Sequence, residues 1–212
     1  MRAFLIALAA TLLTATATAQ RVDLGDGTAL TIDPIETIIS RPGEDQMATL
    51  ARAAAVLQAY TQAHGVEACG EVTVNADNLT RIALGTIHAH LACLSKPQET
   101  DGFASTHQSI HSHPLKAFVM ANAADVAINA HINNVGASGI KQAVHLGDAM
   151  HVSNATFSAE DFMTAGWLVA EGHLLYQNGP DPAHPGATPA VHDLGLVGQL
   201  PTTAAEAVAQ VR

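Results

Sequence analysis

Two His-x-His pairs stand out among the 12 histidines of this 212-residue sequence, His88/His90 and His111/His113. On a β-strand, residues two apart point to the same side, so each pair could offer two imidazoles to one metal ion such as zinc. Pro114 directly follows the second pair, and proline interrupts the hydrogen-bond ladder of a sheet. We therefore take His111 and His113 as candidate metal ligands at the open end of a strand, and His88 and His90 as structural strand residues.

A carboxylate further along the chain could complete this metal site. The segment SAED at positions 158–161 has Ser-x-x-Asp spacing, which is typical of a capping box at the start of a helix. In the first helical turn Asp161 could supply a third ligand oxygen, with Ser158 beside it. Asp125 and Asp148 precede this segment and are alternative acidic ligands.

Glu67 is a candidate general base. It lies in the segment GVEACG at positions 65–70, between a predicted helix and a predicted strand. A solvated loop position is the simplest interpretation of such a residue. To act as a base, Glu67 would need a raised pKa and a water molecule within hydrogen-bond reach.

In chain order, the elements GVEACG, IHSHP and FSAED resemble the motif of the JAMM (MPN/JAB-type) zinc metallopeptidase family. That motif is a Glu, then His-(Ser/Thr)-His-Pro, then Ser-x-x-Asp. The resemblance implies hydrolysis of an amide bond, peptide or isopeptide, in a peptide or protein substrate. It implies that Zn²⁺ is held by His111, His113 and Asp161, that Glu67 transfers protons, and that charge on the substrate carbonyl oxygen is stabilised by Ser158.

The resemblance covers roughly residues 44–177, with one departure from the family pattern. Residues 115–157 separate Pro114 from Ser158, where typical members have only a short spacer. The entropic cost of closing a loop grows slowly with its length, so such an insertion is compatible with the same site. It could act as a lid, a specificity element or a block.

The sequence leaves three other functions open. One is a catalytically inactive JAMM-like module that serves as a binding scaffold. Another is a different zinc peptidase, such as a cell-wall endopeptidase, that uses His111 and His113 with His145 and Asp148. The third is a histidine-rich periplasmic metal buffer, which would have several weak sites instead of one tight site.

The pattern of apolar residues predicts one α+β (α/β-like) domain over residues 20–212, with a mixed β-sheet flanked by helices. Apolar residues at steps of three and four predict a helix over 44–64 that ends at Gly65. The remaining expected elements are helices over 121–132 and 158–165, strands over 71–74, 79–84, 86–94 and 108–114, a loop over 95–106, a hairpin over 167–176, and an irregular tail over 177–212.

The first residues are typical of a cleaved signal peptide. Arg2 precedes an apolar stretch over residues 4–13, and Ala17-Thr18-Ala19 fits a small-x-small cleavage site. A membrane anchor would need roughly 20 apolar residues. We therefore expect residues 1–19 to be removed, with no stable membrane insertion afterwards, and the mature protein to be periplasmic or secreted.

The cysteine content predicts a disulfide, and the net charge limits the kinds of partner that the protein can bind. In an exported chain Cys69 and Cys93 predict a disulfide, with two free buried thiols as the alternative. A formal net charge of -10 without a basic run argues against nucleic-acid binding. Nothing in the sequence indicates an oligomeric state.

Overall fold

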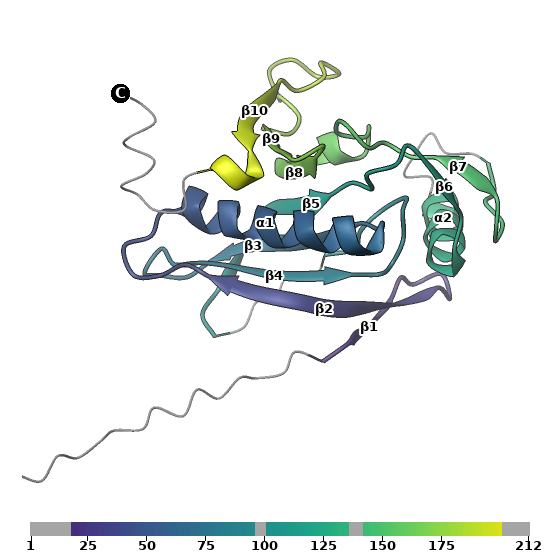
Figure 1. Ribbon diagram of the computed structural model, residues 1–212, viewed down its shortest axis with the longest axis horizontal. Coiled ribbons are helices and arrows are strands. Elements are labelled where there is room, and N and C mark those ends of the chain that lie inside the picture. The colour runs from purple at the N-terminus through teal and green to yellow at the C-terminus, as the bar shows by residue number, and fades with distance from the viewer. Residues whose placement is uncertain (1–17, 96–100, 136–141, 201–212) are drawn as a thin grey trace, which may run out of the picture.

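The computed structural model describes residues 18–95, 101–135 and 142–200. An eight-stranded mixed sheet, in the order β1-β2-β4-β3-β5-β8-β9-β10, forms the body of the protein, and α1 lies across one of its faces (Figure 1). Neighbouring strands are antiparallel except for the parallel pair β5–β8. The expected α+β class is therefore confirmed. The elements are β1 (Gln20–Asp23), β2 (Ala29–Ile39), α1 (Gln46–His64), β3 (Ala68–Val74), β4 (Thr80–Thr86), β5 (Ala104–Ser112), β8 (Gly166–Ala170), β9 (His173–Gln177) and β10 (Val191–Leu196).

The helix α1 agrees with the prediction because both of its ends are encoded locally. The Asp45 carboxylate accepts a hydrogen bond from the Ala48 amide at 2.7 Å and caps the first turn. Gly65 has a left-handed backbone (φ 74°) and ends the helix with a bond from its amide to the Thr61 carbonyl. The buried face of α1 packs on the sheet through a core that includes Leu50, Leu57, Val72, Ile82, Ile110, Trp167 and Leu174.

The insertion over residues 115–157 is more ordered than expected. It contains β6 (Phe118–Met120), α2 (Ala123–Val135) and β7 (Ala149–His151), and β6 pairs with β7 in a separate two-stranded sheet. The Asn122 side chain caps α2 by accepting from the amides of Ala124 and Asp125. Together these elements stand at one end of the large sheet (Figure 1).

Residues 86–94 do not form the predicted strand. The strand β4 ends at Thr86, and His88 adopts a left-handed backbone (φ 60°) that extended pairing does not allow. The segment instead has irregular backbone and is tied to β3 by a disulfide between Cys93 and Cys69, whose Cα atoms lie 5.9 Å apart. The predicted disulfide is therefore confirmed.

Three further predictions need correction. The helix expected over 158–165 is a single 3₁₀ turn, η1 (Asp161–Met163), because Thr164 is already extended and β8 begins at Gly166. The loop expected over 95–106 ends earlier, since β5 begins at Ala104. The tail over 177–212 contains β10 and a second 3₁₀ turn, η2 (Val197–Gln199), because β10 pairs with β9.

The predicted signal peptide lies almost wholly outside the described residues, which begin at position 18. Within the described part of the chain, no helix is long and apolar enough to cross a membrane.

Candidate metal centre

The strand β5 presents alternate side chains to opposite faces of the sheet. Ile110 packs in the core beneath α1, and the Ser112 hydroxyl lies 2.6 Å from the Thr61 hydroxyl of α1. His111 and His113 therefore point away from α1, as the His-x-His spacing predicts. Both imidazoles are largely buried, with side-chain exposures of 11% and 4%.

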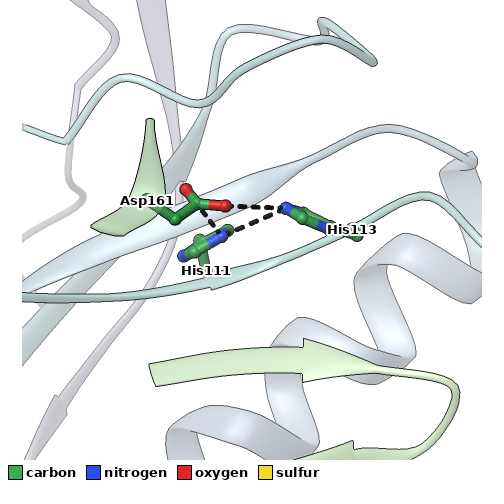
Figure 2. A group of neighbouring side chains, drawn as sticks. All are labelled: His111, His113 and Asp161. Carbon is green, nitrogen blue, oxygen red and sulfur yellow. Dashed lines mark hydrogen bonds and ion pairs between the residues drawn. The ribbon is translucent and has the colours of Figure 1, made fainter. Parts of the chain in front are cut away.

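Asp161 meets these two imidazoles from η1 (Figure 2). The Nε2 atoms of His111 and His113 lie 3.2 Å apart. The Asp161 carboxylate places Oδ1 at 3.3 Å from His111 Nε2 and Oδ2 at 3.5 Å from His113 Nε2. In the described residues this is the only group of three or more His, Cys, Asp or Glu side chains that could hold a metal ion.

The chain around Asp161 holds its carboxylate in place. The amide and the hydroxyl of Ser158 both donate to Asp161 Oδ2, at 2.7 and 2.8 Å. The fully buried Gln177 of β9 donates to the backbone carbonyls of Asp161 and Thr164, at 2.8 and 2.5 Å, so it fixes the 3₁₀ turn to the sheet. Sequence reasoning missed Gln177, and its position in an apolar strand between Tyr176 and a Gly-Pro turn gave no signal of this role.

Glu67 lies just before β3, beside the same cluster. Its Oε1 atom is 4.0 Å from His113 Nε2, and its side chain is only 7% exposed. Two hydrogen bonds hold its backbone in place. Its amide donates to the Ala89 carbonyl at 2.9 Å, and its carbonyl accepts from the Thr86 hydroxyl at 2.7 Å. The solvated-loop interpretation of Glu67 is therefore wrong.

The surroundings shift the pKa values of the two carboxyl groups in opposite directions. Burial raises the pKa of Glu67 well above its usual range, and the nearby charges of Asp161 and Asp125 add to this effect. Burial would also raise the pKa of Asp161, but the imidazoles of His111 and His113 outweigh it and hold that pKa well below its usual range. Burial lowers the pKa of His113. Asp161 therefore ionises more readily, and Glu67 binds a proton more readily, than an ordinary carboxyl group. Groups with perturbed pKa values in a cavity are candidates for a functional site.

A cavity of about 410 Å³ opens onto the cluster. Glu67, His111, His113, Ser158 and Asp161 all line it, so all five predicted site residues meet at one cavity. Its volume is in the range of small-ligand sites. A metal ion held by the three ligands would therefore keep an open side toward the cavity.

The other candidate residues lie elsewhere. His145 and Asp148 bind each other, with Nδ1 and Oδ2 3.3 Å apart, and both are exposed and outside the cluster. His88 pairs with Asp33 across 2.8 Å at the surface. Asp125 is not a ligand of the cluster but is buried against His90.

No protein-family profile matches this chain, and neither the curated proteins nor the solved structures contain a match.

Proposed function

We propose that the protein is an exported zinc-dependent hydrolase of the JAMM type, which cleaves a peptide or isopeptide amide bond. One observation carries this proposal: two imidazoles and a carboxylate from distant segments converge at an open cavity, with a buried glutamate beside them. The motif order GVEACG, IHSHP and FSAED supports the same function.

The spacing of the three ligand residues fits zinc. Zinc–nitrogen and zinc–oxygen bonds of about 2.1 Å in tetrahedral geometry require ligand atoms about 3.4 Å apart. The two Nε2 atoms lie 3.2 Å apart, and the Asp161 carboxylate approaches His111 Nε2 with Oδ1 at 3.3 Å and His113 Nε2 with Oδ2 at 3.5 Å, so the three side chains are grouped at close to this spacing. Three protein ligands with a fourth position open is the arrangement of catalytic zinc. When bound, zinc would supply a Lewis acid that acidifies water and polarises an amide carbonyl.

The proton transfers fall to Glu67. A carboxyl group with a raised pKa accepts a proton more readily than an ordinary carboxylate does, and burial raises the pKa of Glu67. Glu67 would therefore accept the proton of the attacking water and return it to the leaving amine. Its side chain accepts no hydrogen bond within the described residues, so no protein donor there occupies the oxygens that would take the proton.

Ser158 has two possible tasks that follow from its contacts. Its hydroxyl donates to Asp161 in this structure, which orients the ligand. Because the Ser158 amide also donates to the same oxygen, the hydroxyl can rotate toward the cavity without releasing Asp161. There it would stabilise charge that develops on the substrate carbonyl oxygen.

Three observations support export and a protein or peptide substrate. The Cys69–Cys93 disulfide fits an oxidising compartment, and the N-terminal segment has the pattern of a cleaved leader. The acidic chain favours a peptide substrate over nucleic acid.

Metal analysis and three variants test the proposal. Purified protein should contain about one zinc per chain, His111→Ala should lose it, and the surface variant His88→Ala should keep it. Glu67→Gln should retain zinc but lose at least 100-fold in turnover of peptide and isopeptide-linked probes. Iron in place of zinc, or full turnover by Glu67→Gln, would refute the mechanism. Tight zinc binding without hydrolysis of any probe would favour the inactive binding module.

A further inference from the structure

A second histidine–carboxylate pair lies in the wall of the same cavity. His90 Nδ1 is 2.7 Å from Asp125 Oδ2, and Asp125 is fully buried. The Asp125 carboxylate also accepts from the backbone amides of His90, Leu91 and Asn122, at 2.6, 3.2 and 2.9 Å. An acceptor-only carboxylate fixes the proton of the imidazole on Nδ1, so the orientation and tautomer of the His90 ring are set.

The other ring nitrogen of His90 has no partner in the part of the chain that the structure describes. Nε2 makes no hydrogen bond or ion pair among the described residues, and the side chain is 15% exposed. His90 lines the cavity that holds the candidate metal ligands, and it also lines a second cavity beside the end of α1. The carboxylate has a structural role, since it joins the start of α2 to the irregular segment, but the imidazole does not need Nε2 for that role. A polar atom held rigidly at the wall of a cavity is available to a ligand.

The segment that carries His90 is bonded directly to the chain around Glu67, the proposed catalytic base. The carbonyl of Ala89, the residue before His90, accepts from the Glu67 amide at 2.9 Å. Three residues after His90, Cys93 is bonded to Cys69, which is two residues beyond Glu67 on the chain. His90 is therefore held at a fixed place relative to Glu67 by bonds on both sides.

The surroundings of His90 in the cavity are apolar. Leu91 comes from the same irregular segment, and Ile128 and Ile132 come from α2 in the insertion. Ile128 is buried, while Leu91 and Ile132 are half-buried and belong to the same cluster of packed side chains. The cavity thus takes candidate metal ligands from β5 and η1, and takes Leu91, Ile128 and Ile132 together with His90 from the irregular segment and α2.

We propose that His90, Leu91, Ile128 and Ile132 form a substrate-recognition subsite that takes an apolar side chain of the peptide, while His90 Nε2 accepts a hydrogen bond from a backbone amide of that peptide. This inference rests on the proposed function, because it places the scissile bond at the metal cluster. The insertion is then a specificity element of the site. Asp125 is a positioning residue that acts through His90.

Hydroxamates that bind the metal test the subsite without turnover. Calorimetry on the zinc-loaded full-length protein would compare acetohydroxamate, N-acetyl-glycine hydroxamate and N-acetyl-leucine hydroxamate. We expect the leucine probe to bind at least tenfold tighter than the glycine probe, because its side chain enters the apolar wall. His90→Ala should weaken both N-acetyl-amino-acid probes about fivefold and leave acetohydroxamate and zinc binding unchanged.

Matched variants separate the two parts of the subsite. Ile132→Ser should weaken only the leucine probe, and His90→Gln, which keeps an acceptor, should restore most of the lost affinity. His88→Ala is the control, since this neighbouring histidine pairs with Asp33 outside the cavity. Equal affinities of the leucine and glycine probes for the wild type would overturn the inference while leaving the proposed function intact. Unchanged probe affinities in both His90→Ala and Ile132→Ser would do the same. Failure of acetohydroxamate to bind the zinc-loaded wild type would overturn the proposed function and the subsite with it.

Discussion

Replacing Glu67 by glutamine should change how the stability of the metal-free protein depends on pH. Glu67 is buried beside Asp161, and both burial and that charge raise its pKa in the folded state. In the unfolded chain the pKa returns to its ordinary value of 4.5. The folded protein therefore binds more protons than the unfolded chain above pH 4.5, until the pH passes the folded pKa.

The sign follows from this difference in bound protons. The stabilising contribution of protonated Glu67 is complete below pH 4.5 and is lost as the pH rises toward its folded pKa. Over that window one proton changes the free energy of unfolding by about 1.4 kcal/mol for each pH unit. Glu67→Gln has the same shape without the titration, so metal-free Glu67→Gln should become progressively more stable than the wild type through the window and hold a constant advantage above it.

Urea unfolding in the presence of a chelator, from pH 4.5 to 8, measures this difference. His113 and Asp161 titrate in both proteins, so subtracting the two curves isolates Glu67 to first order. Saturating zinc should shrink the advantage, because a nearby cation favours the ionised form of Glu67. Parallel stability curves for wild type and variant without metal would refute the assignment of Glu67 as a buried, hard-to-ionise carboxyl group.

Three other changes have defined outcomes. Ser158→Ala removes one of the two hydrogen bonds from Ser158 to Asp161 Oδ2 and should weaken zinc binding by about 10-fold to 100-fold. A competition titration with a fluorescent chelator measures this affinity, and an unchanged affinity would show that the hydroxyl does not orient the ligand. Gln177→Leu removes the side-chain donor to the part-buried carbonyls of Asp161 and Thr164 and should cost about 1 kcal/mol in urea unfolding as well as zinc affinity. Loss of stability with unchanged zinc affinity would show that this turn does not orient the ligand. The double variant Cys69→Ser/Cys93→Ser opens a loop with a sequence separation of 24 and should lower the free energy of unfolding by roughly 3 kcal/mol, with the reduced wild type matching it.

The parts of the site that could be predicted from sequence are those encoded over a few residues. The His-x-His spacing on a strand fixes which face His111 and His113 share, and the turn ending at Gly65 places Glu67 at the start of the next strand. Ser158 and Asp161 do bind each other as their spacing predicts, even though the helix they would begin stops after one turn.

Other parts depend on partners that are far away in the sequence. The apolar stretch 86–94 has the composition of a strand, but the distant Asp125 carboxylate takes the amides of His90 and Leu91, and the chain stays irregular. Gln177 supports the Asp161 turn through backbone carbonyls, which carry no sequence signature. Local pattern cannot identify either interaction, because each is decided by tertiary packing.

The parallel pairing of β5 with β8 has a consequence for the order in which the protein assembles. Parallel neighbours need a long crossover. Here the crossover begins at His113, continues through α2 and the small sheet, and reaches Asp161 shortly before β8. Contacts between segments this distant form late, because the ordering of the intervening chain opposes them. The cysteines lie much closer together along the chain. Oxidation of the cysteines can therefore precede the pairing of β5 with β8, whereas binding of the metal by all three ligands requires that pairing. A folding intermediate that stops before this step would contain the disulfide and lack the metal ion.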